Sequence, residues 1–414
     1  MESVKKINWK HILFILGIIG PGIITATVDN DAGGITTYSV AGAHFGYSLL
    51  WSLIPITILL VIVQEMVARI GAVTGKGLAD LIRENFGIKI TFFIMIGLVF
   101  ANLFVTLAEF AGIAAAGELF GISRFVLVPI AAFLVWFLIL KLDYKILEKF
   151  FFVVIFLYIA YIISGFMAKP PWGTALKEFV MPTIHFSKGY LFLLIAVIGT
   201  TITPWMQFYL QSSIVEKGIR KEEYKYSRWD VIIGSITTDV VSFFIIVTCS
   251  AVLFTKGIRI ESAVDAAQAL QPFAGQYATM LFAIGFFAAA LFGAFILPIA
   301  TAYYVCEAFG WESGVNKKFK QAKSFYILLS LMIFVSAAAI LIPNINLIYL
   351  MLLAQFMNGI LLPVILIVIL KLVNDKKLMG DYRNSRWMNI VAWTGCVLII
   401  GVSAALLVTT VMGG

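Results

Sequence analysis

Long runs of apolar residues constrain this chain of 414 residues more than any other feature. The hydrocarbon core of a bilayer is about 30 Å thick, so a helix needs roughly 20 apolar residues to cross it. Eleven such runs alternate with short segments that contain charged residues, glycine or proline. They cover residues 12–41, 46–72, 91–119, 124–141, 149–168, 189–216, 228–255, 276–308, 324–342, 345–371 and 386–411. The pattern predicts an all-α polytopic membrane protein.

The composition excludes a soluble protein. Hydrophobic residues make up 61% of the chain and charged residues 13%, whereas soluble domains average about 25% charged residues. Several soluble domains would need cores separated by polar surface, which this composition does not provide. We therefore expect a single transmembrane domain over residues 1–414.

The positive charges indicate an orientation in the membrane. A net charge of +8 would suit nucleic acid if the bases were clustered, but they lie in short loops between the apolar runs. With a cytoplasmic N-terminus, 24 of the 30 Lys and Arg residues lie inside and six outside, the usual bias. The six are Arg124, Lys169, Lys177, Lys188, Lys256 and Arg259. We expect a prokaryotic plasma membrane protein with its C-terminus outside and no nucleic-acid partner.

The first apolar run is interrupted by polar residues and glycine. Its basic start resembles a signal peptide, but the run is too long and includes Asp29 and Asp31, so we keep it as the first helix. Asp29, Asn30 and Asp31 stand beside Gly33 and Gly34. An unbroken helix of about 30 residues would measure about 45 Å, longer than the bilayer core. The sequence predicts a break near Asp31.

The sixth run is predicted to break as well, at Thr200, Thr201, Thr203 and Pro204. Proline lacks an amide donor and clashes with the carbonyl four residues earlier. Five spans separate the starts of the two broken runs, so these runs enter the membrane from opposite sides. This indicates an inverted repeat, with one half at about 12–168, the other at about 189–371 and an extra helix at 386–411. In such transporters the broken helices meet near the midplane, and their unwound carbonyls coordinate cations.

The chemistry at the first break favours a hard cation. A carboxylate inside the membrane is costly, so Asp31 should face a cavity and have a partner. Its neighbours offer oxygen ligands, which suit Mg²⁺ and Ca²⁺ better than softer transition metals.

Several motifs resemble the NRAMP family of divalent-metal transporters. They are GPG at 20–22, DAGG at 31–34, AGA, FGYSLLW, QEMVARIG, TGKGLADLI, LAEFAG around Glu109, GTTITP and the spacing from Gln355 to Pro363. The resemblance covers the first ten spans. It implies a leucine-transporter-like fold with a 5+5 inverted repeat, alternating access, and a metal site between the two broken helices.

The sequence departs from the family at both breaks. The family's Asp-Pro-Gly-Asn is Asp-Ala-Gly-Gly here, so Gly34 replaces an asparagine ligand. Its Met-Pro-His is Thr203-Pro204-Trp205, so a hydroxyl replaces the thioether. These substitutions resemble the NRAMP-related magnesium transporters, a branch of the family. They imply import of Mg²⁺, and of Mn²⁺ too, as a largely hydrated ion.

The resemblance also bears on proton coupling. Glu109 matches an acidic residue of the family's third helix, but Thr106 replaces the acid before it. Asn102, Thr106 and Glu109 share one helix face, so a polar stripe remains with one titratable group. We expect transport without proton coupling, driven by the electrochemical gradient of the ion.

The expected site residues fall into two groups. For the metal we expect Asp31 as the central charge, Thr203 and the Thr200 carbonyl as ligands, Gln355 in the closed site and Gly34 mainly as room. Near them we expect Asp29, Asn30, Glu109, Thr106, Trp205 as a wall, and Asp239. Each group has a structural alternative. The threonine hydroxyls could bond to backbone carbonyls one helical turn back, Gln355 could form a hydrogen bond between helices, and Asp29 or Asn30 could cap a helix.

Other functions remain open. A proton-coupled Mn²⁺ or Fe²⁺ importer would keep the family's usual chemistry, and a non-transporting membrane sensor would need an appended signalling domain. Transport of an organic amine bound by Asp31 is possible by analogy of fold alone. No HExxH or GxSxG motif indicates an enzyme. We expect no cofactor and no obligate protein partner besides the lipid bilayer and the transported ion.

Overall fold

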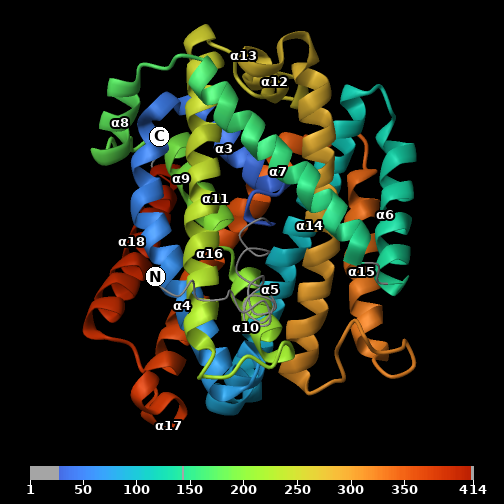
Figure 1. Ribbon diagram of the computed structural model, residues 1–414, viewed down its shortest axis with the longest axis vertical. Coiled ribbons are helices and arrows are strands. Elements are labelled where there is room, and N and C mark those ends of the chain that lie inside the picture. Colours follow the sequence, from blue (N-terminus) through green and yellow to red (C-terminus); the bar gives the residue numbers. More distant parts are fainter. Residues whose placement is uncertain (1–27, 142–143, 412–414) are drawn as a thin grey trace, which may run out of the picture.

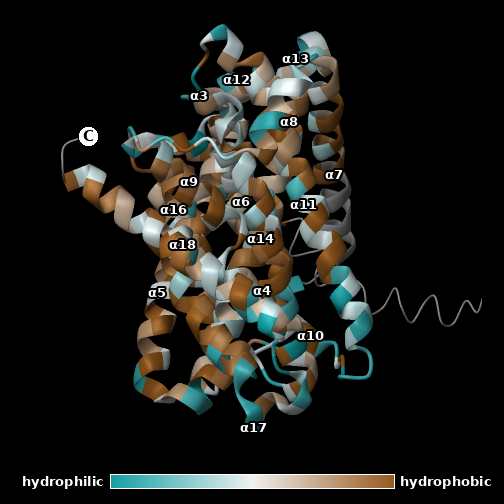
Figure 2. Ribbon diagram, turned by 90° about the vertical axis from the view of Figure 1, so that its left-hand side faces the viewer, coloured by the Kyte–Doolittle hydropathy of each residue, from teal (hydrophilic) through white to brown (hydrophobic). Residues whose placement is uncertain are grey.

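A bundle of long helices, mostly aligned with one axis, makes up the molecule (Figure 1). The computed structural model describes residues 28–141 and 144–411, and no strand occurs in these two ranges. Apolar residues cover the length of the bundle, and hydrophilic residues gather toward its two ends (Figure 2). Large apolar side chains such as Phe93, Phe133 and Leu407 are more than half exposed. An outer surface of this kind suits the hydrocarbon core of a bilayer.

The predicted apolar runs form helices throughout the described residues. The runs at 124–141 and 386–411 match α6 (Arg124–Lys141) and α18 (Arg386–Val411) at both ends. The other long helices are α4 (Leu53–Thr74), α7 (Tyr144–Met167), α11 (Tyr224–Val252), α14 (Ala278–Phe309), α15 (Lys323–Ile340) and α16 (Leu347–Asn374). The short helices are η1 (Gly46–Ser52), α8 (Trp172–Val180), η2 (Phe254–Lys256), α12 (Ala263–Ala267), η3 (Gln268–Leu270), α13 (Gln271–Ala274), η4 (Gly275–Tyr277), α17 (Lys376–Met379) and η5 (Gly380–Tyr382).

The number of spans is close to the expected eleven. In the part of the chain that the structure describes, nine helical stretches are long and apolar enough to cross a membrane. A tenth results if α8 and the end of α7, bent by 118°, count as one span. Residues 32–74 form one stretch in this count, although Gly46, with a φ of 59°, separates α3 (Ala32–Phe45) from η1. The part of the first run at 12–27 lies outside the described residues.

The third helix starts earlier than we expected. The run was predicted to begin at 91, but α5 (Leu78–Leu119) begins at Leu78 and changes direction at Gly87, where φ is 79°. We predicted a later start because the residues before Gly87 include charged side chains, which do not belong to an apolar run. Arg83 bonds to Asp80 at 2.9 Å and donates to the Glu307 carbonyl at 3.0 Å, so its charge is satisfied within helical structure.

Both predicted breaks are confirmed. Val28 and Asp29 are helical, Asn30 and Asp31 interrupt the helix, and α3 begins at Ala32. In the sixth span, α9 (Lys188–Thr201) and α10 (Pro204–Glu216) are separated by Ile202 and Thr203. In Figure 1, α3 and α9 lie in the upper half of the bundle and α10 in the lower half. The second break therefore lies near the middle of the bundle.

Proline explains where the second break falls. Pro204 is the first residue of α10, the position where a missing amide hydrogen costs least. In a continuous helix the amide of residue 204 would bond to the carbonyl of Thr200, and proline has no such amide. The end of α9 therefore keeps carbonyl oxygens without helical donors.

Close backbone contact joins α9 to α16. A Cβ atom on Gly199 would overlap with the Gln355 carbonyl, and one on Gly359 would overlap with the Ile195 carbonyl. Small residues permit such contact between membrane helices. The contact places Gln355 of α16 against the last turn of α9, beside the break.

Replacing Gly199 with alanine tests this contact. We expect Gly199→Ala to lower the free energy of unfolding by about 1–3 kcal/mol, because the added methyl group overpacks the two backbones. Thermal unfolding of the purified protein in detergent measures the effect. Gly401→Ala is the matched control, since a Cβ there meets no atom within 4 Å. Equal melting temperatures for the two variants would contradict the contact.

Candidate metal site at the two helix breaks

Asp31 caps the second half of the first broken helix. Its Oδ1 accepts the Gly34 amide at 2.8 Å, and its backbone is extended, with φ of −69° and ψ of −170°. Its side chain is buried, at 5% exposure. An acid is the favoured residue at this position because it satisfies an otherwise unpaired amide and complements the helix dipole. The structural alternative in which Asp29 or Asn30 caps this helix is therefore wrong.

Asn30 instead anchors the break to neighbouring helices. Its Nδ2 donates to the Thr238 hydroxyl at 2.7 Å and to the Thr238 carbonyl at 3.2 Å. Ser242 donates to Asn30 Oδ1 at 3.1 Å, and the Tyr158 hydroxyl donates to the Asn30 carbonyl at 2.8 Å. Two helices, α11 and α7, thus hold the interrupted turn in place.

Thr200 and Thr203 flank the second break with free hydroxyls. Both residues are buried, and neither hydroxyl has a hydrogen-bond partner among the described residues. The alternative in which such hydroxyls bond one turn back describes Thr201 instead, which donates to the Val197 carbonyl at 2.8 Å. The Thr201 hydroxyl also pairs with the Tyr38 hydroxyl of α3 at 2.6 Å. Thr201 is structural, whereas Thr200 and Thr203 keep oxygen atoms for a ligand.

Gly34 brings the two breaks together. A Cβ atom there would lie 3.3 Å from the Thr200 hydroxyl and would overlap with the Asp29 carbonyl. We expected Gly34 mainly to provide room, but at this position the space is filled by the preceding turn. The missing side chain allows the turn at Asn30 and Asp31 to close tightly.

Gln355 reaches the same point from α16. Both its amide group and Asp31 Oδ1 lie beside Gly33, because a Cβ on Gly33 would overlap with Gln355 Nε2 and lie 3.3 Å from Asp31 Oδ1. Gln355 Oε1 accepts a hydrogen bond from Asn358 at 3.1 Å, while its Nε2 has no partner in the described part of the chain. Asn358 lies on the same helix as Gln355, so the interhelical bond considered as the alternative does not form among the described residues.

The polar stripe on α5 reaches the break only through Glu109. Its Oε2 accepts the Ala32 amide at 3.4 Å, and its buried Oε1 has no partner among the described residues. Thr106 donates to the Asn102 carbonyl at 2.8 Å, and Asn102 donates to the Leu297 carbonyl at 3.1 Å. Glu109 therefore faces the candidate site, whereas Thr106 and Asn102 secure α5 and α14.

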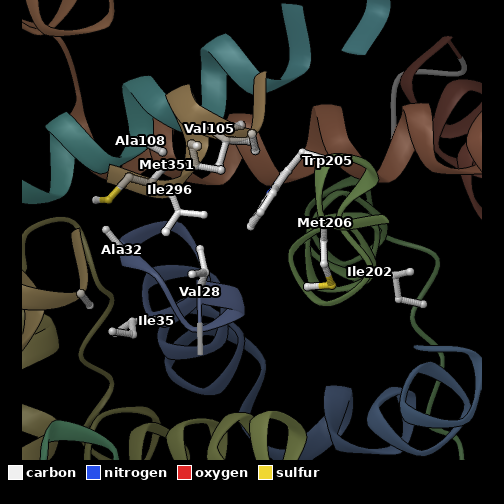
Figure 3. Packing of buried hydrophobic residues seen from close by; sticks show 14 of the residues in the cluster. Val28, Ala32, Ile35, Val105, Ala108, Ile202, Trp205, Met206, Ile296 and Met351 are labelled. Carbon is white, nitrogen blue, oxygen red and sulfur yellow. The ribbon is translucent and has the colours of Figure 1, made fainter. Parts of the chain in front are cut away.

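Trp205, Asp29 and Asp239 surround the junction without joining it. Trp205 is 1% exposed, and in Figure 3 it extends from α10 on the side that faces Val28 and Ala32. Asp29 and Asp239 are buried, and their four carboxylate oxygens have no hydrogen-bond partner in the described ranges. Asp29 interacts electrostatically with both Asp31 and Asp239.

Sequence reasoning missed the residues that hold Asn30. Tyr158 lies in an ordinary apolar run, and nothing local distinguishes it. Thr238 and Ser242 stand one helical turn apart, next to Asp239 in the middle of a span. That spacing of polar residues on one face was the available signal.

The donor set at the junction is the Asp31 carboxylate, with Glu109 beside it, and otherwise neutral oxygens. The described residues contain no group of three or more His, Cys, Asp or Glu side chains placed to hold a metal. Instead, Asp31, the end of α9, Thr203 and Gln355 converge from four segments. Helices broken in mid-membrane around such a centre define a secondary transporter of the leucine-transporter-like fold.

Comparison with known proteins identifies the family. The family model described as "natural resistance-associated macrophage protein-like" matches residues 22–409, so the chain belongs to the Nramp family of divalent-metal transporters. The divalent metal cation transporter MntH of two Klebsiella pneumoniae strains is 26% and 27% identical to it over 407 residues. These alignments cover 96% of this chain and 95% of each relative. The predicted family is confirmed.

Solved structures show the same fold. The Eremococcus coleocola manganese transporter, in complex with an aromatic bis-isothiourea compound, matches with a TM-score of 0.78 at 21% identity. The match covers 100% of this chain and 93% of that one. MhsT in complex with L-phenylalanine matches with a TM-score of 0.59 at 15% identity, over 94% of this chain and 97% of its own. The predicted leucine-transporter-like fold is therefore confirmed.

Removing the Asn30 side chain tests the anchor of the first break. We expect Asn30→Ala to lower the free energy of unfolding by about 1–3 kcal/mol, because it removes the buried hydrogen bonds that link Thr238 and Ser242 to the break and leaves a small cavity. Asn346→Ala is the control, since Asn346 only caps an exposed helix start and should cost about 1 kcal/mol. Thermal unfolding in detergent distinguishes them, and a smaller loss for Asn30→Ala than for Asn346→Ala would refute the anchor.

Proposed function

We propose that this transporter imports Mg²⁺ as a partly hydrated ion by alternating access, without proton coupling. The observation that carries the proposal is the oxygen-rich donor set at the two breaks. Asp31 supplies a carboxylate, Thr200 and Thr203 supply hydroxyls without a partner among the described residues, and the missing amide of Pro204 leaves the Thr200 carbonyl without its helical donor. No cofactor takes part in the proposed cycle, and the bilayer and the ion are the partners it requires.

Oxygen donors support a hard ion over a soft one. Mg²⁺ prefers carboxylates, carbonyls and water, and it gives up its own waters reluctantly. A site with one carboxylate and several neutral oxygens can bind such an ion partly through its water shell. The Gln355 amide can present oxygen as well, because rotating it by 180° exchanges its two ends. Mn²⁺ accepts the same ligands and is expected to pass too.

The membrane potential makes a coupled proton unnecessary. Each elementary charge gains about 2.3 kcal/mol per 100 mV, so a divalent ion gains about 4.6 kcal/mol. That energy corresponds to more than a thousandfold concentration ratio. The stripe on α5 supports the absence of coupling, because Thr106 is bonded to the Asn102 carbonyl and only Glu109 can titrate. The orientation we propose has the N-terminus in the cytoplasm and the C-terminus outside.

Proton-coupled Mn²⁺ import is the second candidate. Relatives at 26–27% identity are named divalent metal cation transporters, and a structural neighbour is named a manganese transporter. In addition, Glu109 and Asp31 lie on either side of the Ala32 amide and influence each other electrostatically. Two neighbouring acids could share a proton and release it when the cation binds.

The Asp31→Asn variant tests the site and the coupling together. In proteoliposomes with an imposed potential, we expect native protein to carry Mg²⁺ without changing the internal pH. Asp31→Asn should reduce the flux at least tenfold, because the central charge is lost while the shape is kept. Asp381→Asn, in the exposed short helix η5, is the control and should transport normally. Ion-driven acidification by the native protein would favour the second candidate, and full flux through Asp31→Asn would exclude the site.

Restoring a thioether tests selectivity. We expect Thr203→Met to raise Mn²⁺ uptake relative to Mg²⁺ uptake several-fold, because sulfur binds transition metals better than Mg²⁺. The ratio is measured as Mn²⁺ uptake with and without millimolar Mg²⁺. Thr410→Met, on the exposed side of α18, carries the same substitution away from the site. Native Mn²⁺ uptake that millimolar Mg²⁺ leaves undiminished would contradict a magnesium site.

A further inference from the structure

A groove on the outer side of the bundle lies apart from the two breaks. It lies between α4 and α11, and Phe179 of α8 forms part of its wall. Its volume is about 430 Å³. Ile58, Ile236 and Val240 line it and are 46%, 48% and 44% exposed, so the groove opens on the surface that faces lipid. Apart from Thr57 and one acid, its lining is apolar.

That acid is Asp239, and no basic side chain of the described residues forms an ion pair with it. The residue is 5% exposed, and neither of its carboxylate oxygens has a hydrogen-bond partner among the described residues. Asp239 acts electrostatically on Asp29 of the first break. Thr57 of α4 lines the same groove, and its hydroxyl donates to the Leu53 carbonyl at 2.6 Å. An acid at this depth costs several kcal/mol and normally has a cationic partner.

The other side chains that line the groove indicate which chemical groups a ligand there would carry. Phe243 and Phe244 of α11 and Phe179 of α8 contribute aromatic rings, and Phe179 and Phe243 pack edge to face with centroids 5.0 Å apart. Aromatic rings accept apolar groups, and their faces attract cations. The volume is within the range of pockets that hold small organic molecules.

We propose that this groove binds amphipathic organic cations from the bilayer, with an ammonium group at Asp239 and Thr57 and an apolar body among the phenylalanines. Charge complementarity selects this occupant over a lipid acyl chain, which would fill the groove but leave the acid uncompensated. The site is separate from the transported ion. Its occupant would still act close to the first break, because Asn30 is bonded to Thr238, the neighbour of Asp239.

A matched pair of ligands tests the proposal. The probes are 4-phenylbutylamine, which is charged at neutral pH, and 4-phenyl-1-butanol, which has the same body without the charge. Calorimetric titration of the full chain in lipid nanodiscs, free of divalent ions and with empty nanodiscs subtracted, gives the affinities. We expect the amine to bind the native protein at least tenfold more tightly than the alcohol does.

Four variants locate the binding. Asp239→Asn should weaken amine binding at least tenfold and leave alcohol binding unchanged. Ile236→Trp should abolish binding by filling the groove, whereas Ile327→Trp, an equally apolar and exposed position on α15, should not. Asp31→Asn should bind the amine like the native chain, which separates this site from the proposed ion site.

Three results would overturn the proposal. The first is equal affinity of the amine for native protein and Asp239→Asn. The second is equal affinity of amine and alcohol, which would indicate a groove for lipid chains. The third is loss of amine binding in Asp31→Asn but not in Asp239→Asn, which would place the amine at the helix breaks. Asp239→Asn removes a buried charge and keeps the shape of the side chain. Ile236→Trp fills the groove and keeps the acid, so it is an independent test. None of these measurements depends on Mg²⁺ transport.

Discussion

Every backbone amide and carbonyl at bilayer depth needs a partner, and the way the two breaks meet this requirement creates the candidate site. At the first break, the Asp31 side chain pairs with the amide of Gly34. At the second, Pro204 has no amide to pair. The missing amide of Pro204 leaves the Thr200 carbonyl without its helical donor, and the hydroxyls of Thr200 and Thr203 have no partner among the described residues. A centre with these oxygen atoms and the carboxylates of Asp31 and Glu109 favours a cation.

Local sequence patterns contained most of the fold and the centre of the site. Apolar runs located the helices, and proline, glycine and an intramembrane acid located the breaks at Asp31 and Pro204. The early start of α5 was missed because the charge of Arg83 is satisfied by the end of α14, far along the chain. The anchor at Asn30 was missed for the same reason, since its partner Thr238 is 208 residues away. Contacts between distant segments have no local signature, even where each residue alone is conspicuous.

Family and ion selectivity depend on different parts of the molecule. Helix packing fixes the fold, as at Gly199 and Gly359, and the fold matches that of a solved structure at 21% identity. The choice of ion depends on a few side chains at the breaks, and exchanging Thr203 for a methionine changes no helix boundary. The fold of this chain can therefore be inferred from a relative more securely than the ion that it transports. The local chemistry of Asp31, Thr200 and Thr203 carries the proposal of a magnesium site.

A cation that reaches the proposed site would interact electrostatically with the buried acids at and near the first break. Asp29 interacts electrostatically with Asp31 and with Asp239, and no basic side chain forms an ion pair with any of the three within the described residues. Repulsion between ionised acids makes the arrangement without an ion less stable, and in the proposed site a cation at Asp31 reduces it. A ligand shifts a conformational equilibrium only by its difference in affinity between states. The proposed alternating access therefore requires that the distance between the ion and these acids differ between the two end states.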